Sequence, residues 1–286
     1  MRSLRVFWKS EAKPLLVDAL RRARLLAHAD RVLYLNSLLR SRGSNAAFGP
    51  AHASLPLPPP HLVFDACGHT DYESYFESGV QDARTIADIV ESNIRRDHVS
   101  VCEWGCGPAR VLRHLGCMWP RGQIGLYGSD YNAESIEWCR SHLKGIHFTL
   151  NQMLPPLPFE SQSFDCVYAI SVFTHLSKVR HFDWIEELSR VLRPDGIVIF
   201  TTHGDSSTHE LLRHEERHYR AGELVVRGNF EEGKRCYVAH QPPAFVQQQL
   251  LGGWRLVSHA SFSRTQDIWV ARRGDPKTAR PAGSRP

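Results

Sequence analysis

The sequence predicts an α/β fold built on a doubly wound, mostly parallel sheet, and three observations lead to this prediction. Short apolar runs alternate with helical patterns from Val99 to Thr202, as in strands joined by crossover helices. A glycine-rich turn follows the first of these runs, within 99–110. Two further runs, Trp254–Phe262 and Gln266–Arg272, are separated by only a few polar residues, so they predict an antiparallel hairpin at the C-terminal end of the sheet.

Residues 1–45 are predicted to form a basic helical leader. Apolar residues such as Leu16, Leu20 and Ala23 recur at three- and four-residue steps, with arginines between them. The leader holds ten lysines and arginines against three acids, whereas the whole chain carries a net charge of only +5. Such a helix packs on the main domain, on a partner, or on an anionic membrane surface, and nucleic acid is a further alternative.

The rest of the chain divides at changes in composition. Residues 46–64 read as a proline-rich linker with extended backbone, because they contain the run Leu-Pro-Leu-Pro-Pro-Pro. Residues 65–272 then form one domain, in which Gln81–Ile94 is a predicted helix and 203–240 a polar, histidine-rich insertion or lid. Residues 273–286 predict a disordered tail. No apolar stretch approaches the ~20 residues that span a bilayer.

The turn after the first strand is suited to a nucleotide-type cofactor. Gly105 and Gly107 let the backbone approach a ligand closely, and the helix that follows directs its free N–H groups at the same place. A dinucleotide fingerprint would require a small residue at Arg110. The alternative spacing, acid-x-Gly-x-Gly-x-small, fits Glu103, the two glycines and Ala109.

The second strand, predicted to start at Gln123, ends at an acidic residue. Asp130 lies 23 residues beyond Gly107, where a carboxylate can accept both ribose hydroxyls of a bound nucleotide. Enzymes that use NAD and enzymes that use S-adenosylmethionine both need this contact, so Asp130 does not separate the two classes.

Longer motifs carry a resemblance to a known family. The stretch L-P-F-x-x-x-S-F-D begins at Leu157, and E-L-x-R-V-L-R-P-x-G runs from Glu187 to Gly196. Together with the turn, they resemble the class I S-adenosylmethionine-dependent methyltransferases over Asp65–Arg272. The resemblance implies a seven-stranded, Rossmann-like sheet and S-adenosylmethionine as the cofactor. The stretches S-V-F-T-H-L and T-T-H-G resemble a bacterial subgroup associated with glycan or natural-product pathways.

The resemblance also implies where the cofactor is bound. The acid and the glycines of the turn would face the methionine part of the cofactor. The acid at the end of the second strand would bind the ribose, and the residues that follow the second and third strands would contact the adenine. The region before the first strand would fold over the cofactor. The residues assigned to the cofactor site are Glu103, Gly105, Gly107, Asp130, Tyr131, Asn151, Ser171 and Tyr75.

Two histidines are candidate catalytic residues. His175 follows the fourth strand and His203 follows the fifth, and ligands of open α/β sheets bind outside the carboxyl ends of the strands. Either could remove a proton from an acceptor hydroxyl. We therefore expect methyl transfer to an oxygen of a small molecule, such as a sugar-containing or related metabolite, and no nucleic-acid substrate.

Two other functions remain open at this point. A catalytically silent cofactor-binding or scaffold protein is allowed because Ala109 departs from the usual third glycine of the turn. An NAD-dependent oxidoreductase is disfavoured by Arg110 and by the terminal hairpin.

No metal site is predicted. His214, Glu215 and His218 match the H-E-x-x-H motif of zinc peptidases, but the surrounding helix is charged throughout and no third ligand is evident. Cys102 and Cys106 are interpreted as structural thiols. The chain has seven cysteines, an odd number, which favours reduced thiols in a cytoplasmic protein over a disulfide framework.

Overall fold

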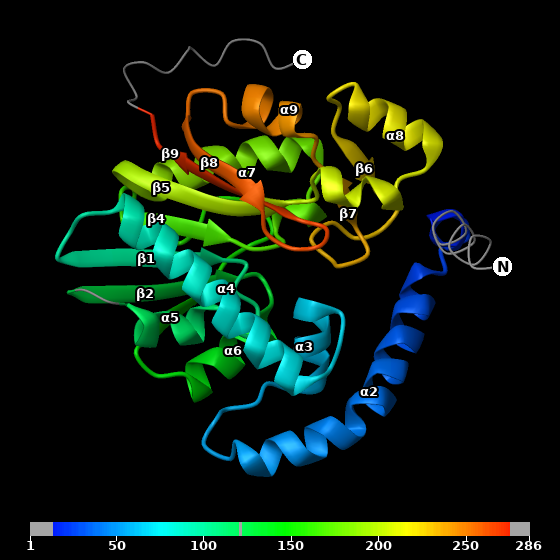
Figure 1. The fold of residues 1–286 in the computed structure, drawn as a ribbon, viewed down its shortest axis with the longest axis horizontal. Helices are drawn as coiled ribbons and strands as arrows, with labels where there is room; N and C mark the ends of the chain where they lie inside the picture. Colours follow the sequence, from blue (N-terminus) through cyan, green and yellow to red (C-terminus); the bar gives the residue numbers. More distant parts are fainter. Residues whose placement is uncertain (1–13, 120–121, 275–286) are drawn as a thin grey trace.

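A seven-stranded sheet with helices on both faces forms the centre of the computed structural model, which describes residues 14–119 and 122–274 (Figure 1). The strand order is β3-β2-β1-β4-β5-β9-β8. Strand β9 runs antiparallel to both of its neighbours, β5 and β8, and the other strand pairs of this sheet are parallel, which confirms the predicted fold class and terminal hairpin. The strands are β1 (His98–Trp104), β2 (Gln123–Asp130), β3 (Ile146–Leu150), β4 (Phe164–Ala169), β5 (Leu192–Thr202), β8 (Arg255–Ser261) and β9 (Asp267–Arg272).

The central strands are buried on both faces, as expected for parallel strands covered by helices. Alternate residues of β4 pack into different cores: Cys166 and Tyr168 face one layer, and Val167 and Ala169 face the other. The first layer contains α4 (Tyr72–Asn93), α5 (Leu112–Met118) and α6 (Ala133–His142). The second contains α7 (Lys178–Val191) and α9 (Pro243–Phe245), which continues as the π-helical turn η3 (Val246–Leu250).

Two helices differ in extent from the prediction. Helix α4 begins nine residues before Gln81, because the Asp71 side chain accepts a hydrogen bond from Ser74 N at 2.8 Å and caps the helix there. Helix α7 is capped by Ser177 and ends at Val191. Strand β5 therefore contains the Pro-Asp-Gly segment that the sequence pattern placed at the end of the helix.

The leader is helical in its described part, in 14–22 and in α2 (Leu26–Ala51). Helix α2 thus continues into the predicted linker, and α3 (Pro60–Cys67) begins within that linker with a proline at its first position. Residues 1–13 and the greater part of the predicted tail, 275–286, lie outside the described residues. Within the described residues, no helix is both long enough and apolar enough to cross a membrane.

The insertion folds into a small unit at the carboxyl end of the sheet (Figure 1). It contains the 3-10 turn η2 (Asp205–Glu210), α8 (Arg213–Arg220), and a two-stranded antiparallel sheet of β6 (Val225–Arg227) and β7 (Val238–His240). Residues 228–237, which join these two strands, are called the β6–β7 loop below. The H-E-x-x-H residues lie on α8, where Glu215 forms an ion pair with Arg227. Among the described residues, no group of three or more His, Cys, Asp or Glu is arranged to hold a metal ion.

Candidate functional site

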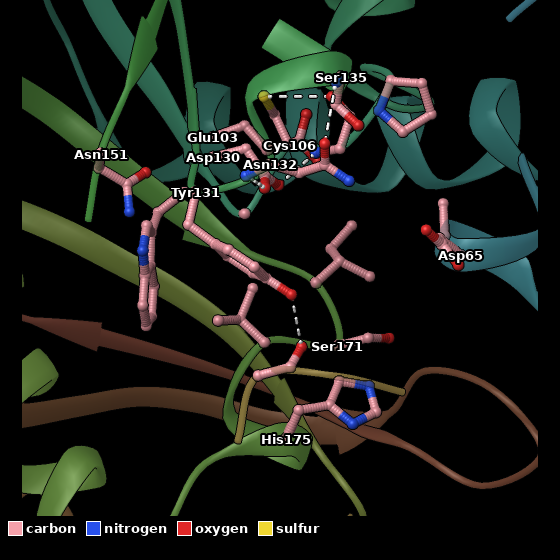
Figure 2. Close-up of a pocket in the computed structure, with 18 of the residues that line it drawn as sticks. Asp65, Glu103, Cys106, Asp130, Tyr131, Asn132, Ser135, Asn151, Ser171 and His175 are labelled. Atoms are coloured by element: carbon pink, nitrogen blue, oxygen red, sulfur yellow. Dashed lines mark hydrogen bonds between the residues drawn. The ribbon is translucent and has the colours of Figure 1, made fainter. Parts of the chain in front are cut away.

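A cavity opens at the carboxyl ends of β1, β2, β3 and β4, where the sequence pattern placed the cofactor (Figure 2). The segments that follow these four strands line the cavity. The β6–β7 loop closes it on one side through Gly233, Lys234 and Arg235. Seven of the eight predicted cofactor residues and one of the two predicted catalytic histidines line this cavity: Glu103, Gly105, Gly107, Asp130, Tyr131, Asn151, Ser171 and His175.

The turn after β1 has a backbone that requires glycine. Gly105 has a φ of +75°, and a Cβ on it would lie 2.3 Å from Cγ2 of Val172. Gly107 and Ala109 also have positive φ values, of +49° and +56°. Ala109 therefore adopts the left-handed conformation that favours glycine, although it carries a side chain. The amides of Gly105 and Cys106 both donate to the carbonyl of Ser129, which fixes the turn against β2.

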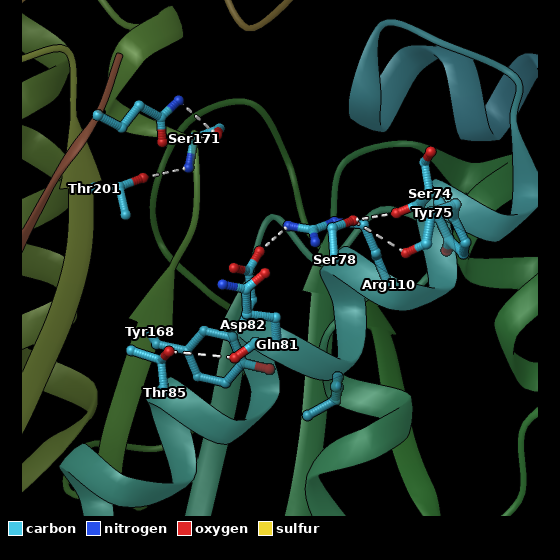
Figure 3. A network of polar contacts seen from close by, with 12 residues as sticks. Ser74, Tyr75, Ser78, Gln81, Asp82, Thr85, Arg110, Tyr168, Ser171 and Thr201 are labelled. Atoms are coloured by element: carbon cyan, nitrogen blue, oxygen red, sulfur yellow. Dashed lines mark hydrogen bonds and ion pairs between the residues drawn. The ribbon is translucent and has the colours of Figure 1, made fainter. Parts of the chain in front are cut away.

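One face of α4 supports this turn from behind. Tyr75 donates from its hydroxyl to the carbonyl of Pro108 at 3.1 Å. Asp82 pairs with Arg110 at 2.6 Å, as Figure 3 shows. Between them, a Cβ on Gly79 would lie 2.3 Å from the Arg110 carbonyl oxygen. Tyr75 is fully buried and is not among the residues that line the cavity, so it contacts the turn rather than covering the cofactor. Asp82 and Gly79 were not singled out from the sequence: Asp82 falls in the predicted helix Gln81–Ile94, and Gly79 lies just before its predicted start.

Glu103 is a buried carboxyl group beneath the turn. Its Oε2 accepts hydrogen bonds from Leu112 N at 3.2 Å and from the Tyr168 hydroxyl at 3.0 Å, which joins the start of α5 to β4. Burial raises the pKa of Glu103 to about 8. A cationic ligand group beside it would favour the ionised form, so this acid suits the ammonium end of a cofactor.

Asp130 ends β2 with its carboxylate held by the backbone. One oxygen accepts from Gly107 N at 2.7 Å and the other from Asn132 N at 2.8 Å. Burial raises the pKa of Asp130, and these hydrogen bonds oppose that change. A carboxylate has about four acceptor positions, so both oxygens can also accept a hydroxyl from a ribose in the cavity.

The wall of the cavity contains one side-chain oxygen, that of Asn151, which has no hydrogen-bond partner in the described part of the chain. The amide of Asn151 is 5% exposed, and its Oδ1 is buried without a hydrogen bond. Such an oxygen costs free energy unless a donor reaches it, and the exocyclic amine of an adenine is one such donor. Tyr131 lies on the same side, where its hydroxyl donates to the Gly233 carbonyl at 3.1 Å.

The two candidate catalytic histidines lie in different places. His175 lines the cavity and donates from Nδ1 to the carbonyl of Tyr237 at 2.7 Å. Because a carbonyl only accepts, this bond leaves Nε2 unprotonated, and Nε2 has no partner among the described residues. Burial lowers the pKa of His175 to about 4, so its ring is neutral at physiological pH.

His203 makes a similar bond from Nδ1, to the carbonyl of Ala239 at 3.0 Å. It packs beside His240 in the insertion, with the ring centroids 5.1 Å apart, and it is not among the residues that line the cavity. Burial also lowers the pKa of His203. The geometry therefore favours His175 over His203 as the group that meets a bound acceptor.

Comparison with known proteins identifies the domain that carries this site. Residues 102–200 match the family described as a methyltransferase domain. The malonyl-[acyl-carrier protein] O-methyltransferase of Salmonella typhimurium is 28% identical over 116 residues, which are 41% of this chain and 43% of that protein. The aligned segment thus spans less than half of that curated relative.

Solved structures share the fold at low sequence identity. A chain of the complex between the Haloferax volcanii Trm112 methyltransferase activator and the putative methyltransferase superimposes with a TM-score of 0.52 at 14% identity. This match covers 77% of the present chain and all of that chain. The CMeT domain of the citrinin polyketide synthase superimposes with a TM-score of 0.50 at 17% identity, over 69% of this chain and 52% of that one.

The cavity residues fit the cofactor of that family. Gly105 and Gly107 place backbone without side chains in the wall of the cavity, the buried acid beneath them suits an ammonium group, and the Asn151 oxygen lacks a donor. The seven-stranded sheet with its antiparallel strand β9 is also the one that the resemblance implies. Residues 102–200 therefore match a methyltransferase domain, and the fold and the cavity are those expected of a class I enzyme with S-adenosylmethionine as its cofactor.

Proposed function

We propose that the protein transfers a methyl group to an oxygen of a small molecule in the cytoplasm, and that His175 accepts the proton of the acceptor. The observation that carries this proposal is a neutral imidazole in the wall of the cofactor cavity. Its Nδ1 is engaged with Tyr237, so its Nε2 is the nitrogen left to accept a proton. The curated relative is named an O-methyltransferase, which supports oxygen as the acceptor atom.

In the proposed reaction, each group of the chain has a separate task. Bound S-adenosylmethionine supplies a methyl carbon that its sulfonium has already activated. The turn and Asp130 hold the cofactor, while the β6–β7 loop excludes water from it. The cofactor would give up this methyl group to the acceptor oxygen and leave as S-adenosylhomocysteine, and Nε2 of His175 would take the hydroxyl proton. Positioning of this kind contributes several kcal/mol when the reacting atoms are held ~3 Å apart.

The acceptor class is part of the same proposal. The S-V-F-T-H-L stretch, which contains His175, resembles the bacterial subgroup associated with glycan and natural-product pathways. A sugar-containing or related metabolite is therefore the proposed acceptor. Turnover of S-adenosylmethionine on a panel of glycan precursors and other hydroxylated metabolites tests it. Binding of S-adenosylmethionine without turnover on any member would instead favour a silent binding protein, and tight binding of NAD would favour an oxidoreductase.

Two matched variants test which histidine is the base. We expect His175→Ala to lower kcat about 10²-fold or more with cofactor affinity nearly unchanged, because general-base catalysis contributes about that much. His203→Ala should keep most of the activity. The base must be neutral, so the wild-type rate should rise with pH through the lowered pKa of His175, about 4, and stay level above it.

A loss of kcat in His203→Ala alone would transfer the role to that residue. Weak losses in both variants would contradict base catalysis, and would indicate an acceptor that needs no base, such as an ionised carboxylate or an amine.

We further propose that the leader contacts an anionic lipid surface. Val32, Leu35 and Leu39 are 63%, 51% and 73% exposed and lie on one side of α2, with Arg40 and Arg42 exposed nearby. Sedimentation with phosphatidylglycerol vesicles should recover the protein, and Leu39→Glu or high salt should reduce that recovery. Equal recovery with phosphatidylcholine vesicles would contradict the proposal.

A further inference from the structure

The β6–β7 loop contacts both ends of the cofactor site. Its Gly233 accepts from the Tyr131 hydroxyl at 3.1 Å, and its own amide donates to the His175 carbonyl at 3.0 Å. Tyr237, at the end of the loop, accepts the hydrogen bond from Nδ1 of His175. The position of this loop therefore affects the proposed adenine side and the candidate base together.

The loop has little regular structure of its own to hold it in place. Strands β6 and β7 are three residues each and pair only with one another. Asn229 and Gly233 have positive φ values, of +56° and +83°, so the loop lacks extended backbone at both positions. A two-stranded unit this short is marginal by itself, so contacts from elsewhere must fix the loop.

One arginine of the leader contacts both ends of the loop. Nη1 of Arg21 donates to the carbonyls of Arg227 and Gly228, at 2.6 and 2.8 Å, and to that of Cys236 at 3.2 Å. These acceptors lie more than 200 positions away in the sequence, on the two sides of the loop. Arg21 is 6% exposed, and burial lowers its pKa, although an arginine stays charged at all physiological pH values.

A second leader residue contacts the loop where it lines the cavity. Asp30 of α2 forms an ion pair with Arg235. The Arg235 guanidinium also lies over the ring of Phe64 in α3, 4.4 Å from its centroid. Arg235 is thus held between α2 and α3 while it lines the cofactor cavity. Two side chains of the leader, nine residues apart, are fixed on one loop.

We propose that the N-terminal leader is a strap that holds the β6–β7 loop closed over the cofactor, with Arg21 and Asp30 as positioning residues. Loops that cover a cofactor control its release as well as the access of water. The leader lengthens the residence of the cofactor because the loop opens only when the leader contacts break. This role does not depend on the identity of the acceptor.

The first test measures the loop without turnover. In full-length Arg21→Ala, hydrogen exchange of the amides in 229–236 should become about tenfold faster in the free protein. The dissociation constant of S-adenosylhomocysteine should rise about tenfold, mainly through faster dissociation. Arg21→Lys, which keeps the charge and three donors, should recover part of both effects. Arg31→Ala, an exposed arginine on the same leader, should change neither.

Unchanged exchange and affinity in a folded Arg21→Ala protein would overturn the proposal. If that variant fails to fold, a charge reversal of the Asp30–Arg235 ion pair tests the proposal instead. Asp30→Arg should weaken S-adenosylhomocysteine binding, and adding Arg235→Asp should restore at least half of the loss, because the reversed charges again attract. If the losses of S-adenosylhomocysteine affinity in the two single variants simply add in the double variant, the proposal is overturned.

Discussion

At the scale of single residues, Asp130 links the backbone of the turn to the proposed ribose site. Asp130→Ala removes the acceptor for the Gly107 and Asn132 amides, and with it the acceptor proposed for both ribose hydroxyls. Buried groups left without a partner cost ~1–3 kcal/mol, so the affinity for S-adenosylmethionine should fall roughly 5- to 100-fold by calorimetry. Asp88→Ala, an exposed acid on α4, is the control and should bind normally. Normal binding by Asp130→Ala would remove this residue from the ribose site.

Some site residues could be predicted from the sequence because the chemistry leaves few choices. A turn with positive φ and a close neighbour needs glycine, so Gly105 was identifiable from its type and spacing alone. His175 and His203 could not be separated in this way, since both follow a strand at the same edge of the sheet. The insertion separates them, because only His175 remains in the wall of the cavity.

At the scale of elements, α4 shows why the support of the turn could not be predicted. Its first turns carry mostly polar residues, and a pattern without apolar periodicity reads as a loop. The structure shows instead a capped helix whose Tyr75, Gly79 and Asp82 contact the glycine turn on one face. Such contacts depend on how close two backbones come, which the residue types alone do not reveal.

Gly79→Ala tests this close approach. The added Cβ would meet the Arg110 carbonyl oxygen at 2.3 Å, so α4 or the turn must shift. Overpacking of this kind costs about 1–3 kcal/mol, and we expect a lower free energy of unfolding together with weaker S-adenosylmethionine binding. Gly43→Ala in α2 is the matched control, because nothing lies within 4 Å of its Cβ. It should be neutral or stabilising by up to ~1 kcal/mol. Equal stability of the two variants in chemical denaturation would contradict the tight contact.

At the scale of the whole molecule, the sheet was predictable and the packing of the leader was not. Alternating strands and helices restrict the topology, so the parallel order and the final hairpin followed from the sequence. The Arg21 contacts join residues more than 200 positions apart. In the sequence, Arg21 is one of ten basic residues in the leader, and nothing local distinguishes it from the exposed ones.

Buried neutral histidines make the free energy of unfolding of the whole protein depend on pH in the acid range. His181 is fully buried, with Nδ1 donating to the Ser177 carbonyl at 2.8 Å and Nε2 bonded to the Gln241 amide at 3.0 Å. Burial lowers the pKa of both His175 and His181 to about 4, and it lowers that of His240 well below its usual value. An unfolded histidine titrates near 6.5, so below that pH the unfolded chain binds more protons than the folded protein.

The free energy of unfolding of the cofactor-free protein should therefore fall as the pH is lowered from about 6.5 to 5, above the range in which most carboxylates begin to protonate. Glu103 opposes this fall, because its raised pKa of about 8 favours the folded state in acid, and burial also raises the pKa of Asp65 and Asp130. Six histidines of the described chain have lowered pKa values, however, so we expect the fall to dominate. Chemical denaturation at several pH values and fixed ionic strength measures the slope. His181→Gln cannot take up the proton and should show a shallower fall. A constant free energy of unfolding between pH 6.5 and 5 would show that these histidines are not held neutral by the fold.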